Sequence, residues 1–120
     1  MKKKLMVVDD SRIMELQICK LLEDSDFEVV AYCENGEEAI ARYAEIQPDV
    51  VTMDIIMPGI DGLETAQVLL EEYPEAKILM VSSLAYEDTI QEADRIGTRG
   101  FLYKPLSREK LIEALENTLA

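Results

Sequence analysis

Histidine and tryptophan are absent from the 120-residue chain, and cysteine occurs only twice, as Cys19 and Cys33. Without histidine, no imidazole of this chain can serve as an acid, a base or a metal ligand. The two cysteines form neither a CxxC motif nor a zinc-binding pattern, which argues against a thiol-based metal site. So low a cysteine content fits a protein of a reducing compartment.

Positive charge is scarce. The chain has 12 lysine and arginine residues against 25 aspartate and glutamate residues, which gives a formal net charge of −13. A protein that binds nucleic acid must neutralise phosphates with basic side chains, so this balance argues against a nucleic-acid partner. We interpret the charge excess as a solvated surface.

Long hydrophobic runs are also missing. The segment Met1-Lys-Lys-Lys resembles the basic start of a signal peptide, but the apolar run behind it stops at Asp9 and Asp10. A run from Leu5 to Val8 is too short to direct export or to span a bilayer. We therefore expect a cytoplasmic protein without membrane contact.

The composition is that of an ordinary globular protein, with 48% hydrophobic and 31% charged residues. The length suits one domain, which we assign to residues 1–120. Short apolar runs alternate with helical patterns, and several runs lack in-out alternation, which is typical of parallel strands covered on both faces. The predicted strands are 4–8, 27–32, 49–53, 77–81 and 100–103.

Helical periodicity follows each of these strands. Ser11, Asn35 and Ser107 stand where helices would begin, and Asn35 with Glu38 resembles a capping box. Gly97 suits the end of the fourth helix. The apolar stripes of the five helices are Met14, Ile18, Leu21 and Leu22; Ile40, Tyr43 and Ala44; Leu63, Ala66, Leu70 and Tyr73; Ile90 and Ala93; and Leu111, Ala114, Leu115 and Leu119.

Five strand–helix units without a repeat or a linker predict a doubly wound α/β fold, in which helices cover both faces of a five-stranded parallel sheet. Ligands of such folds bind outside the carboxyl ends of the strands, where the strand order reverses. The residues that follow the strands are therefore the candidates for function.

Reactive groups follow four of the predicted strands. Asp9 and Asp10 follow the first, Asp54 the third and Lys104 the fifth, while the fourth leads into the hydroxyl of Ser82. Carboxylates this close repel one another, so either one is protonated or a cation neutralises them. Mg²⁺ or Mn²⁺ suits such oxygen ligands. Metal, ammonium and hydroxyl around one nucleophilic carboxylate favour phosphoryl transfer.

Each of these residues also has a purely structural interpretation. An aspartate after a strand is usually a helix cap or a turn residue, and we assign that role to Asp61 beside Gly62. Taken alone, Lys104 is a solvated lysine, Ser82 a turn residue and Phe101 a core aromatic. The joint occurrence of charged groups at separate strand ends nevertheless favours a functional site over chance.

Four segments resemble the receiver domain of bacterial response regulators, whose fold is CheY-like (flavodoxin-like). They are Val7-Val-Asp-Asp-Ser11, Met53-Asp54-Ile-Ile-Met57-Pro58-Gly59-Ile60-Asp61-Gly62, Ser82 and Lys104-Pro105. The resemblance extends over the entire chain. The combination of the acidic pair with the Asp-x-x-Met-Pro-x-x-Asp-Gly segment is highly specific.

The resemblance implies a role for each acidic-pocket residue. Asp54 would accept a phosphoryl group from the phosphohistidine of a sensor kinase or phosphotransfer protein. Asp10, Asp54 and the backbone carbonyl of Ile56 would ligate Mg²⁺ directly, and Asp9 would act chiefly through water. Lys104 would pair with the phosphoryl oxygens.

The resemblance also implies a switch. Ser82 would turn inward to bond the phosphate, and Phe101 would fill the space that it leaves, because the added charge attracts a donor. The Lys104–Pro105 peptide bond would be cis. The docking surface would comprise the fourth helix, the fifth strand and the fifth helix, around Tyr86, Phe101 and a partly exposed Tyr103.

Two positions bear on the lifetime of the phosphorylated form. Ile56 lies two residues beyond Asp54, and Leu84 lies two residues beyond Ser82. Neither side chain can hydrogen-bond a water molecule that attacks the acyl phosphate. We expect slow loss of the phosphoryl group unless a phosphatase or reverse transfer intervenes.

Other classes of protein fit less well. A phosphohydrolase of the haloacid-dehalogenase type has a second aspartate two residues after its nucleophile, where this chain has Ile56. A flavodoxin-type electron carrier needs a hydroxyl-rich phosphate loop, where this chain has Asp9 and Asp10, and no Walker or GxGxxG loop is present. A receiver that has lost phosphorylation is disfavoured because the acidic residues are all present.

We therefore expect a stand-alone receiver, a signalling switch that catalyses only its own phosphorylation and dephosphorylation. With nothing after the fifth helix, its output would be protein docking, as in chemotaxis or a phosphorelay, and it would be a monomer or a phosphorylation-dependent dimer. The alternative is a receiver cut from a larger regulator with a DNA-binding or enzymatic output domain.

Overall fold

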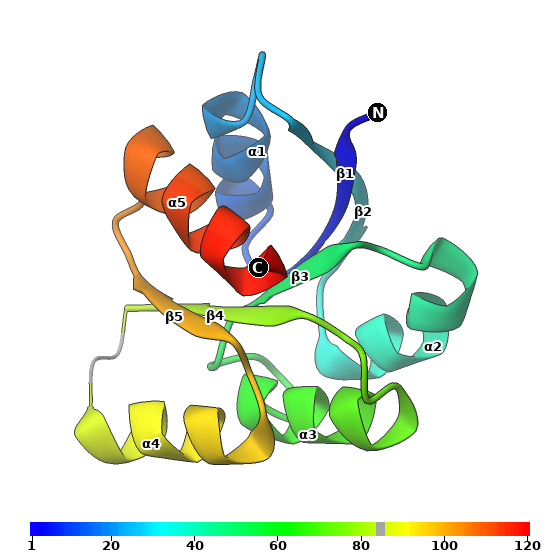
Figure 1. Cartoon of the computed structure of the whole chain (residues 1–120). Coiled ribbons are helices and arrows are strands. Elements are labelled where there is room, and N and C mark those ends of the chain that lie inside the picture. The colour runs from blue at the N-terminus through cyan, green and yellow to red at the C-terminus, as the bar shows by residue number, and fades with distance from the viewer. Residues whose placement is uncertain (84–85) are drawn as a thin grey trace.

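The computed structural model describes residues 1–83 and 86–120, and Leu84 lies outside the described residues. Strands and helices alternate along the chain (Figure 1). The strands are β1 (Lys3–Val8), β2 (Phe27–Cys33), β3 (Val50–Met53), β4 (Ile78–Ser82) and β5 (Gly100–Tyr103). The helices are α1 (Arg12–Leu21), α2 (Gly36–Ile46), α3 (Gly62–Glu72), α4 (Glu87–Ile96) and α5 (Arg108–Leu119).

The five strands form one parallel sheet in the order β2-β1-β3-β4-β5. In Figure 1, α1 and α5 cover one face of the sheet, and α2, α3 and α4 cover the other. The predicted doubly wound fold is therefore confirmed. The strand order reverses between β1 and β3, so the carboxyl ends of these two strands flank the expected ligand site.

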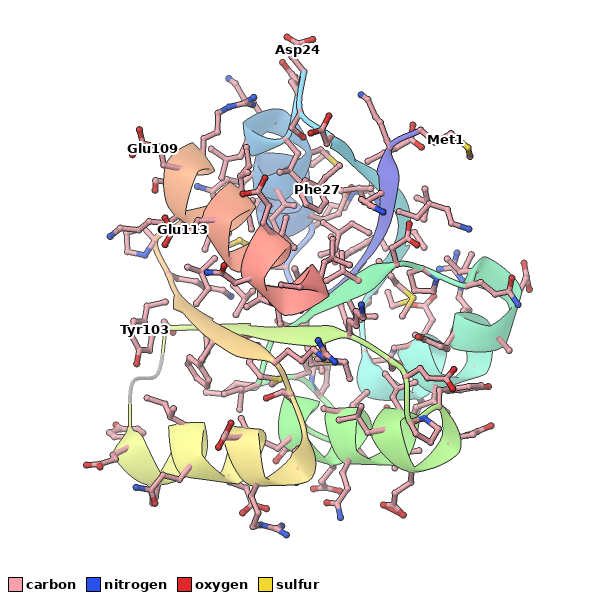
Figure 2. All side chains as sticks on the ribbon, viewed as in Figure 1. Met1, Asp24, Phe27, Tyr103, Glu109 and Glu113 are labelled. Atoms are coloured by element: carbon pink, nitrogen blue, oxygen red, sulfur yellow. The ribbon has the colours of Figure 1, made fainter. Side chains whose placement is uncertain are left out.

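The sheet divides the core into two layers. Leu5 and Val7 of β1 pack into the layer under α1 and α5, while Met6 and Val8 pack into the layer under α2, α3 and α4. These four side chains are at most 1% exposed. Burial on both faces explains the unbroken apolar runs Leu5–Val8 of β1 and Ile78–Val81 of β4. Figure 2 shows Phe27 within the core and Asp24, Glu109 and Glu113 directed outward.

Side-chain caps begin four of the helices. Ser11, Asn35, Asp61 and Ser107 each accept a hydrogen bond from the backbone N–H three residues later, which satisfies an amide that the helix leaves unpaired. The role of Asp61 as a cap is thus confirmed. The capping-box prediction is only half right, because the Glu38 carboxylate accepts from the N–H of Glu34 and not from that of Asn35.

The strand boundaries differ slightly from prediction. β2 and β4 extend one residue further, to Cys33 and Ser82, while β3 and β4 begin one residue later than expected. Asp49 lies before β3, and its carboxylate accepts the backbone N–H of Lys4 at 2.7 Å. The side chain of Lys77 likewise leaves the sheet, and its ammonium donates to the Leu119 carbonyl at 3.0 Å. These polar contacts hold the two side chains just before β3 and β4.

Both cysteine thiols are free. Burial is the main reason why the pKa of Cys19 and that of Cys33 are each raised to about 11. The thiols are therefore protonated and poorly reactive at neutral pH. None of the helices in the described part of the chain combines the length and apolarity that a bilayer-spanning helix requires.

Gly62 allows the β3–α3 loop to fold back on itself. Its N–H donates to the Ile55 carbonyl at 2.7 Å. A Cβ atom at this position would lie 1.9 Å from the backbone oxygen of Asp54. Only glycine fits at this distance, so the Asp-Gly pair that starts α3 also determines the path of the chain around Asp54.

We predict that Gly62→Ala lowers the free energy of unfolding by about 2–3 kcal/mol, because the backbone of the loop must move to admit the methyl group. Urea denaturation measures the change. Gly97→Ala is the control: it costs only about 1 kcal/mol for its left-handed backbone, since φ is +105° and the nearest atom to the added carbon is 3.5 Å away. Equal losses in the two variants would contradict the proposed backbone clash.

Candidate functional site

The acidic site lies at the carboxyl ends of β1 and β3. The backbone N–H of Asp54 donates to the Val8 carbonyl at 2.9 Å, and that of Asp9 donates to the Cys33 carbonyl at 3.0 Å. Both aspartates therefore continue the hydrogen-bonding ladder just beyond their strands. Their carboxylates are brought together by the pairing of β1 with β3.

Lys104 reaches the two carboxylates from the end of β5. Its ammonium lies 3.1 Å from Asp9 Oδ2 and 3.5 Å from Asp54 Oδ1. The backbone N–H of Lys104 donates to the Ser82 carbonyl at 2.9 Å, which ties the lysine to β4. The peptide bond between Lys104 and Pro105 is cis, as the family resemblance implied. The predicted convergence of strand-end charges is confirmed for this lysine.

Asp10 completes the acidic group. One carboxylate oxygen from each of Asp9, Asp10 and Asp54 lies within 4.8 Å of the others. Asp9 and Asp54 are buried, whereas Asp10 is exposed. Three carboxylates with one exposed side fit a hard divalent cation that retains water ligands, such as Mg²⁺.

The environment of Asp54 opposes its charge. Burial, followed by repulsion from Asp9, raises the pKa of Asp54 from 3.8 to about 6. The Lys104 ammonium and the backbone N–H of Ile55, which donates to Oδ1 at 2.9 Å, lower the pKa by less. The ionised form of Asp54 is thus destabilised, and a cation or a covalent modification of the carboxylate relieves this cost.

The other predicted site residues lie on the surrounding strands and loops. Ser82 is buried at the end of β4, opposite Tyr103 of β5. Phe101 is half-buried against the core layer under α4, and its ring centroid lies 5.4 Å from that of Tyr103, which is 47% exposed. Ile56, two residues beyond Asp54 in the chain, is 62% exposed.

Two contacts of the site were not predicted. The Ser11 N–H donates to Asp9 Oδ1 at 2.8 Å, so Asp9 accepts both a backbone amide and the Lys104 ammonium. The backbone N–H of Ile55 likewise donates a hydrogen bond to Asp54 Oδ1. Because any residue type supplies a backbone amide, the sequence carries no signal for these donors. The closer approach of Lys104 to Asp9 than to Asp54 also depends on the folded geometry.

Comparison with known proteins agrees with this geometry. The family model of the response regulator receiver domain matches residues 5–116. The chemotaxis protein CheY of Listeria monocytogenes is 42% identical over 113 residues, which cover 94% of this chain and 95% of the relative. CheY of Bacillus subtilis is 35% identical over 119 residues and 99% of both chains.

A solved structure is also closely similar. It is the CheX–CheY–BeF3–Mg²⁺ complex from Borrelia burgdorferi, with a TM-score of 0.93 at 28% sequence identity. The alignment covers 98% of this chain and 90% of that one. The similarity therefore includes the whole sheet and all the strand ends that carry the acidic group.

The raised pKa of Asp54 predicts a pH-dependent gain in stability from Asp54→Asn in the presence of a chelator. Folding favours the protonated carboxyl group, so the wild type loses stability as the pH rises from about 4 to about 6. The variant is free of this loss. It should be more stable by about 2–3 kcal/mol at neutral pH and nearly equal to the wild type at pH ~4.

Denaturant unfolding at several pH values measures this difference. Asp61→Asn is the matched control, since asparagine also caps a helix and Asp61 lies on the same loop. A stability difference between Asp54→Asn and the wild type that does not change with pH would contradict the assigned electrostatic strain.

Proposed function

The chain belongs to the response regulator receiver domain family, and from this premise we propose that Asp54 is the carboxylate that it phosphorylates. It is a phosphorylation-activated receiver of two-component signalling, and its only chemistry is its own phosphorylation and dephosphorylation. The observation that supports the assignment of Asp54 is the convergence of Asp9, Asp54 and Lys104. The domain is proposed to comprise residues 1–120.

The proposed step is an in-line displacement at phosphorus. A carboxylate oxygen of Asp54 forms a bond to phosphorus as the bond from phosphorus to the imidazole nitrogen of a donor phosphohistidine breaks. The imidazole leaves with the electron pair and takes a proton from water. The product on this chain is an acyl phosphate. With no histidine of its own, the chain requires its donor in another protein or in a small phosphorylated molecule.

Asp10, Asp54 and the Ile56 carbonyl are proposed to hold Mg²⁺, with Asp9 acting through water. The ion would supply neutralisation of the charge on the phosphoryl oxygens. Mn²⁺ offers similar ligand chemistry. The hydrogen bonds of Asp9 with the Lys104 ammonium and the Ser11 amide hold its carboxylate in place within the acidic site.

Lys104 is proposed to stabilise the phosphorylated product. In the unmodified chain its ammonium is shared between Asp9 and Asp54. A phosphoryl group on Asp54 adds negative charge within reach of this ammonium. Phosphorylation thus strengthens the attraction between the ends of β3 and β5.

The switch is proposed to extend from Ser82 to Phe101. The backbone N–H of Lys104 donates a hydrogen bond to the Ser82 carbonyl. Phe101 lies on β5, three residues before Lys104 in the chain. Movement of the Ser82 hydroxyl toward a phosphoryl group would change the space available to Phe101. The exposed rings of Tyr86 and Tyr103 lie on the proposed output face of α4, β5 and α5.

We propose that this switch acts in chemotaxis, because the CheY proteins of Listeria monocytogenes and Bacillus subtilis are 42% and 35% identical to it and match over nearly their whole length. Its proposed partners are a sensor kinase or phosphotransfer protein and a downstream protein target, all in the cytoplasm. A phosphorelay intermediate, or the receiver part of a larger regulator, uses the same residues at the site.

Incubation with acetyl phosphate and Mg²⁺ tests the phosphoacceptor. Intact-mass spectrometry should show the mass of one added phosphoryl group, which is absent from Asp54→Asn and from samples with a chelator. Asp61→Asn, the cap variant on the same loop, should be phosphorylated like the wild type. If Asp54→Asn acquired the phosphoryl group to the same extent as the wild type, the assignment of Asp54 would be contradicted.

The Ile56 side chain predicts a slow loss of the phosphoryl group. Ile56→Asn introduces an amide that can orient an attacking water molecule, so the decay rate of the phosphorylated chain should rise several-fold. Decay is followed after removal of acetyl phosphate. Val68→Asn, an exposed apolar position on α3, should leave the rate unchanged. If Ile56→Asn also leaves it unchanged, Ile56 is not the cause of slow decay.

A further inference from the structure

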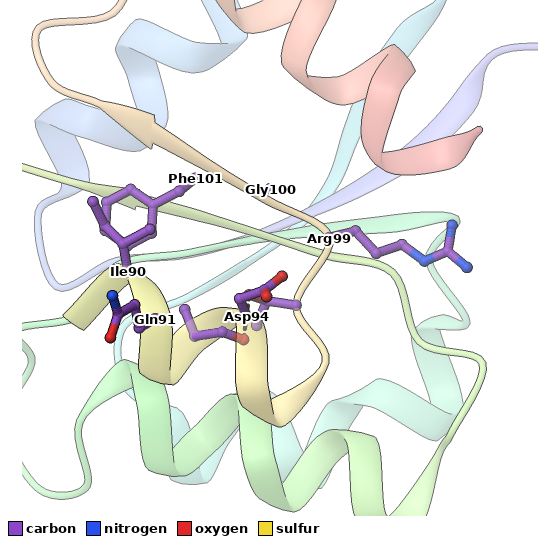
Figure 3. A pocket seen from close by; sticks show the side chains of 8 residues that line it. Ile90, Gln91, Asp94, Arg99, Gly100 and Phe101 are labelled. Atoms are coloured by element: carbon purple, nitrogen blue, oxygen red, sulfur yellow. Dashed lines mark hydrogen bonds between the residues drawn. The ribbon is translucent and has the colours of Figure 1, made fainter. Parts of the chain in front are cut away.

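A cavity of about 320 Å³ lies between α4 and β5 (Figure 3). Ile90 and Ala93 of α4 and Phe101 of β5 give it apolar walls. Asp94 of α4 also lines it, and Figure 3 shows this side chain between the helix and the strand. The cavity therefore has an aromatic and aliphatic interior with a carboxylate at its edge.

The basic residue that lines the cavity does not neutralise Asp94. Arg99 lines the same cavity, but its guanidinium donates to the Ala120 carbonyl at 2.8 Å and extends away from Asp94 in Figure 3. Within residues 1–83 and 86–120, no salt bridge or side-chain hydrogen bond involves the Asp94 carboxylate. Asp94 is exposed, so its charge is available to a partner.

The rest of α4 is acidic. The helix carries Glu87, Asp88, Glu92 and Asp94 against one basic residue, Arg95. Arg95 is already paired with Glu92, with Nε 3.0 Å from the carboxylate. Three carboxylates of α4 thus remain without a cation among the described residues, and β5 has no charged residue to balance them.

We propose that this cavity binds an arginine or lysine side chain from a basic segment of a partner protein. The aliphatic stem of such a side chain packs on Ile90 and Phe101, and its cationic head meets the Asp94 carboxylate. Arginine in particular is enriched among the residues that dominate binding energy at protein interfaces. The unpaired carboxylates of α4 would attract the surrounding basic segment and accelerate its association.

Charge also disfavours a second copy of this chain as the occupant. A symmetric interface places the same patch on both subunits, so the acidic α4 helices would repel each other. The inference rests on the proposed function only in treating α4 and β5 as part of the output face. Because Phe101 forms both a wall of the cavity and part of the proposed switch, phosphorylation and partner binding would be linked.

A short amphipathic peptide of arginine, leucine and alanine is a suitable probe, with a citrulline counterpart that removes only the charge. Titration of the ¹⁵N-labelled chain, followed by NMR, should give saturable shifts at Ile90, Gly100 and Phe101 with the arginine peptide alone. Asp94→Asn should weaken binding by about fivefold, the loss of one partly exposed ion pair.

Asp88→Asn is the matched control, since it removes the same charge from the same exposed helix but outside the cavity lining. It should weaken binding by less than about twofold. Equal weakening by the two variants, or equal binding of the citrulline peptide, would show nonspecific attraction and overturn the proposal. The proposal would also be overturned if the wild-type chain formed a dimer whose stability Asp94→Asn altered, because the cavity would then be part of a contact between two copies.

Phosphorylation of Asp94→Asn by acetyl phosphate separates this inference from the proposed function. The variant should gain the phosphoryl group as the wild type does, because Asp94 belongs to neither the acidic group nor the Lys104 contacts. Loss of phosphorylation in this variant would contradict the claim that Asp94 takes no part in the acidic site. Normal phosphorylation without specific peptide binding would refute the cavity proposal alone.

Discussion

The position of the Lys104 ammonium between Asp9 and Asp54 is the interaction on which the functional arrangement depends. Asp54 is buried and repelled by Asp9, so its charge is costly without a cation. Lys104 offsets part of this cost, and the open side beside Asp10 leaves room for a divalent ion. The unmodified site is therefore under electrostatic strain, which a phosphoryl group with its metal would redistribute. A neutral, relaxed aspartate would lack this sensitivity.

The fold links this local charge to a distant surface through short backbone connections. Lys104 is hydrogen-bonded to β4 through the Ser82 carbonyl and follows β5 directly. Phe101 and Tyr103 stand on the same strand with their rings close together. A change in the attraction between Asp54 and Lys104 thus acts on the strand that forms one wall of the α4–β5 cavity. No long chain of side chains is needed for the coupling.

The sequence predicted the five strands, their parallel arrangement and the meeting of charged strand ends, because buried runs and helix caps are local patterns. Ser11, Asp61 and Ser107 cap helices as expected. The partners of Asp9 were not predictable, because one is a backbone amide and the other is a lysine 95 residues away. The contact of Arg99 with the Ala120 carbonyl at the end of α5 likewise depends on tertiary geometry. Together with the pairing of Arg95 with Glu92, it leaves Asp94 without a cation among the described residues.

The most direct test of the central claim is a crystal structure of the chain grown with Mg²⁺ and beryllofluoride, which mimics a phosphoryl group. The account predicts beryllium bonded to the Asp54 carboxylate, the metal among Asp9, Asp10 and Asp54, and the Lys104 ammonium against a fluoride. Beryllofluoride bound at another residue, or an acidic group that stays unchanged at saturating reagent, would contradict it.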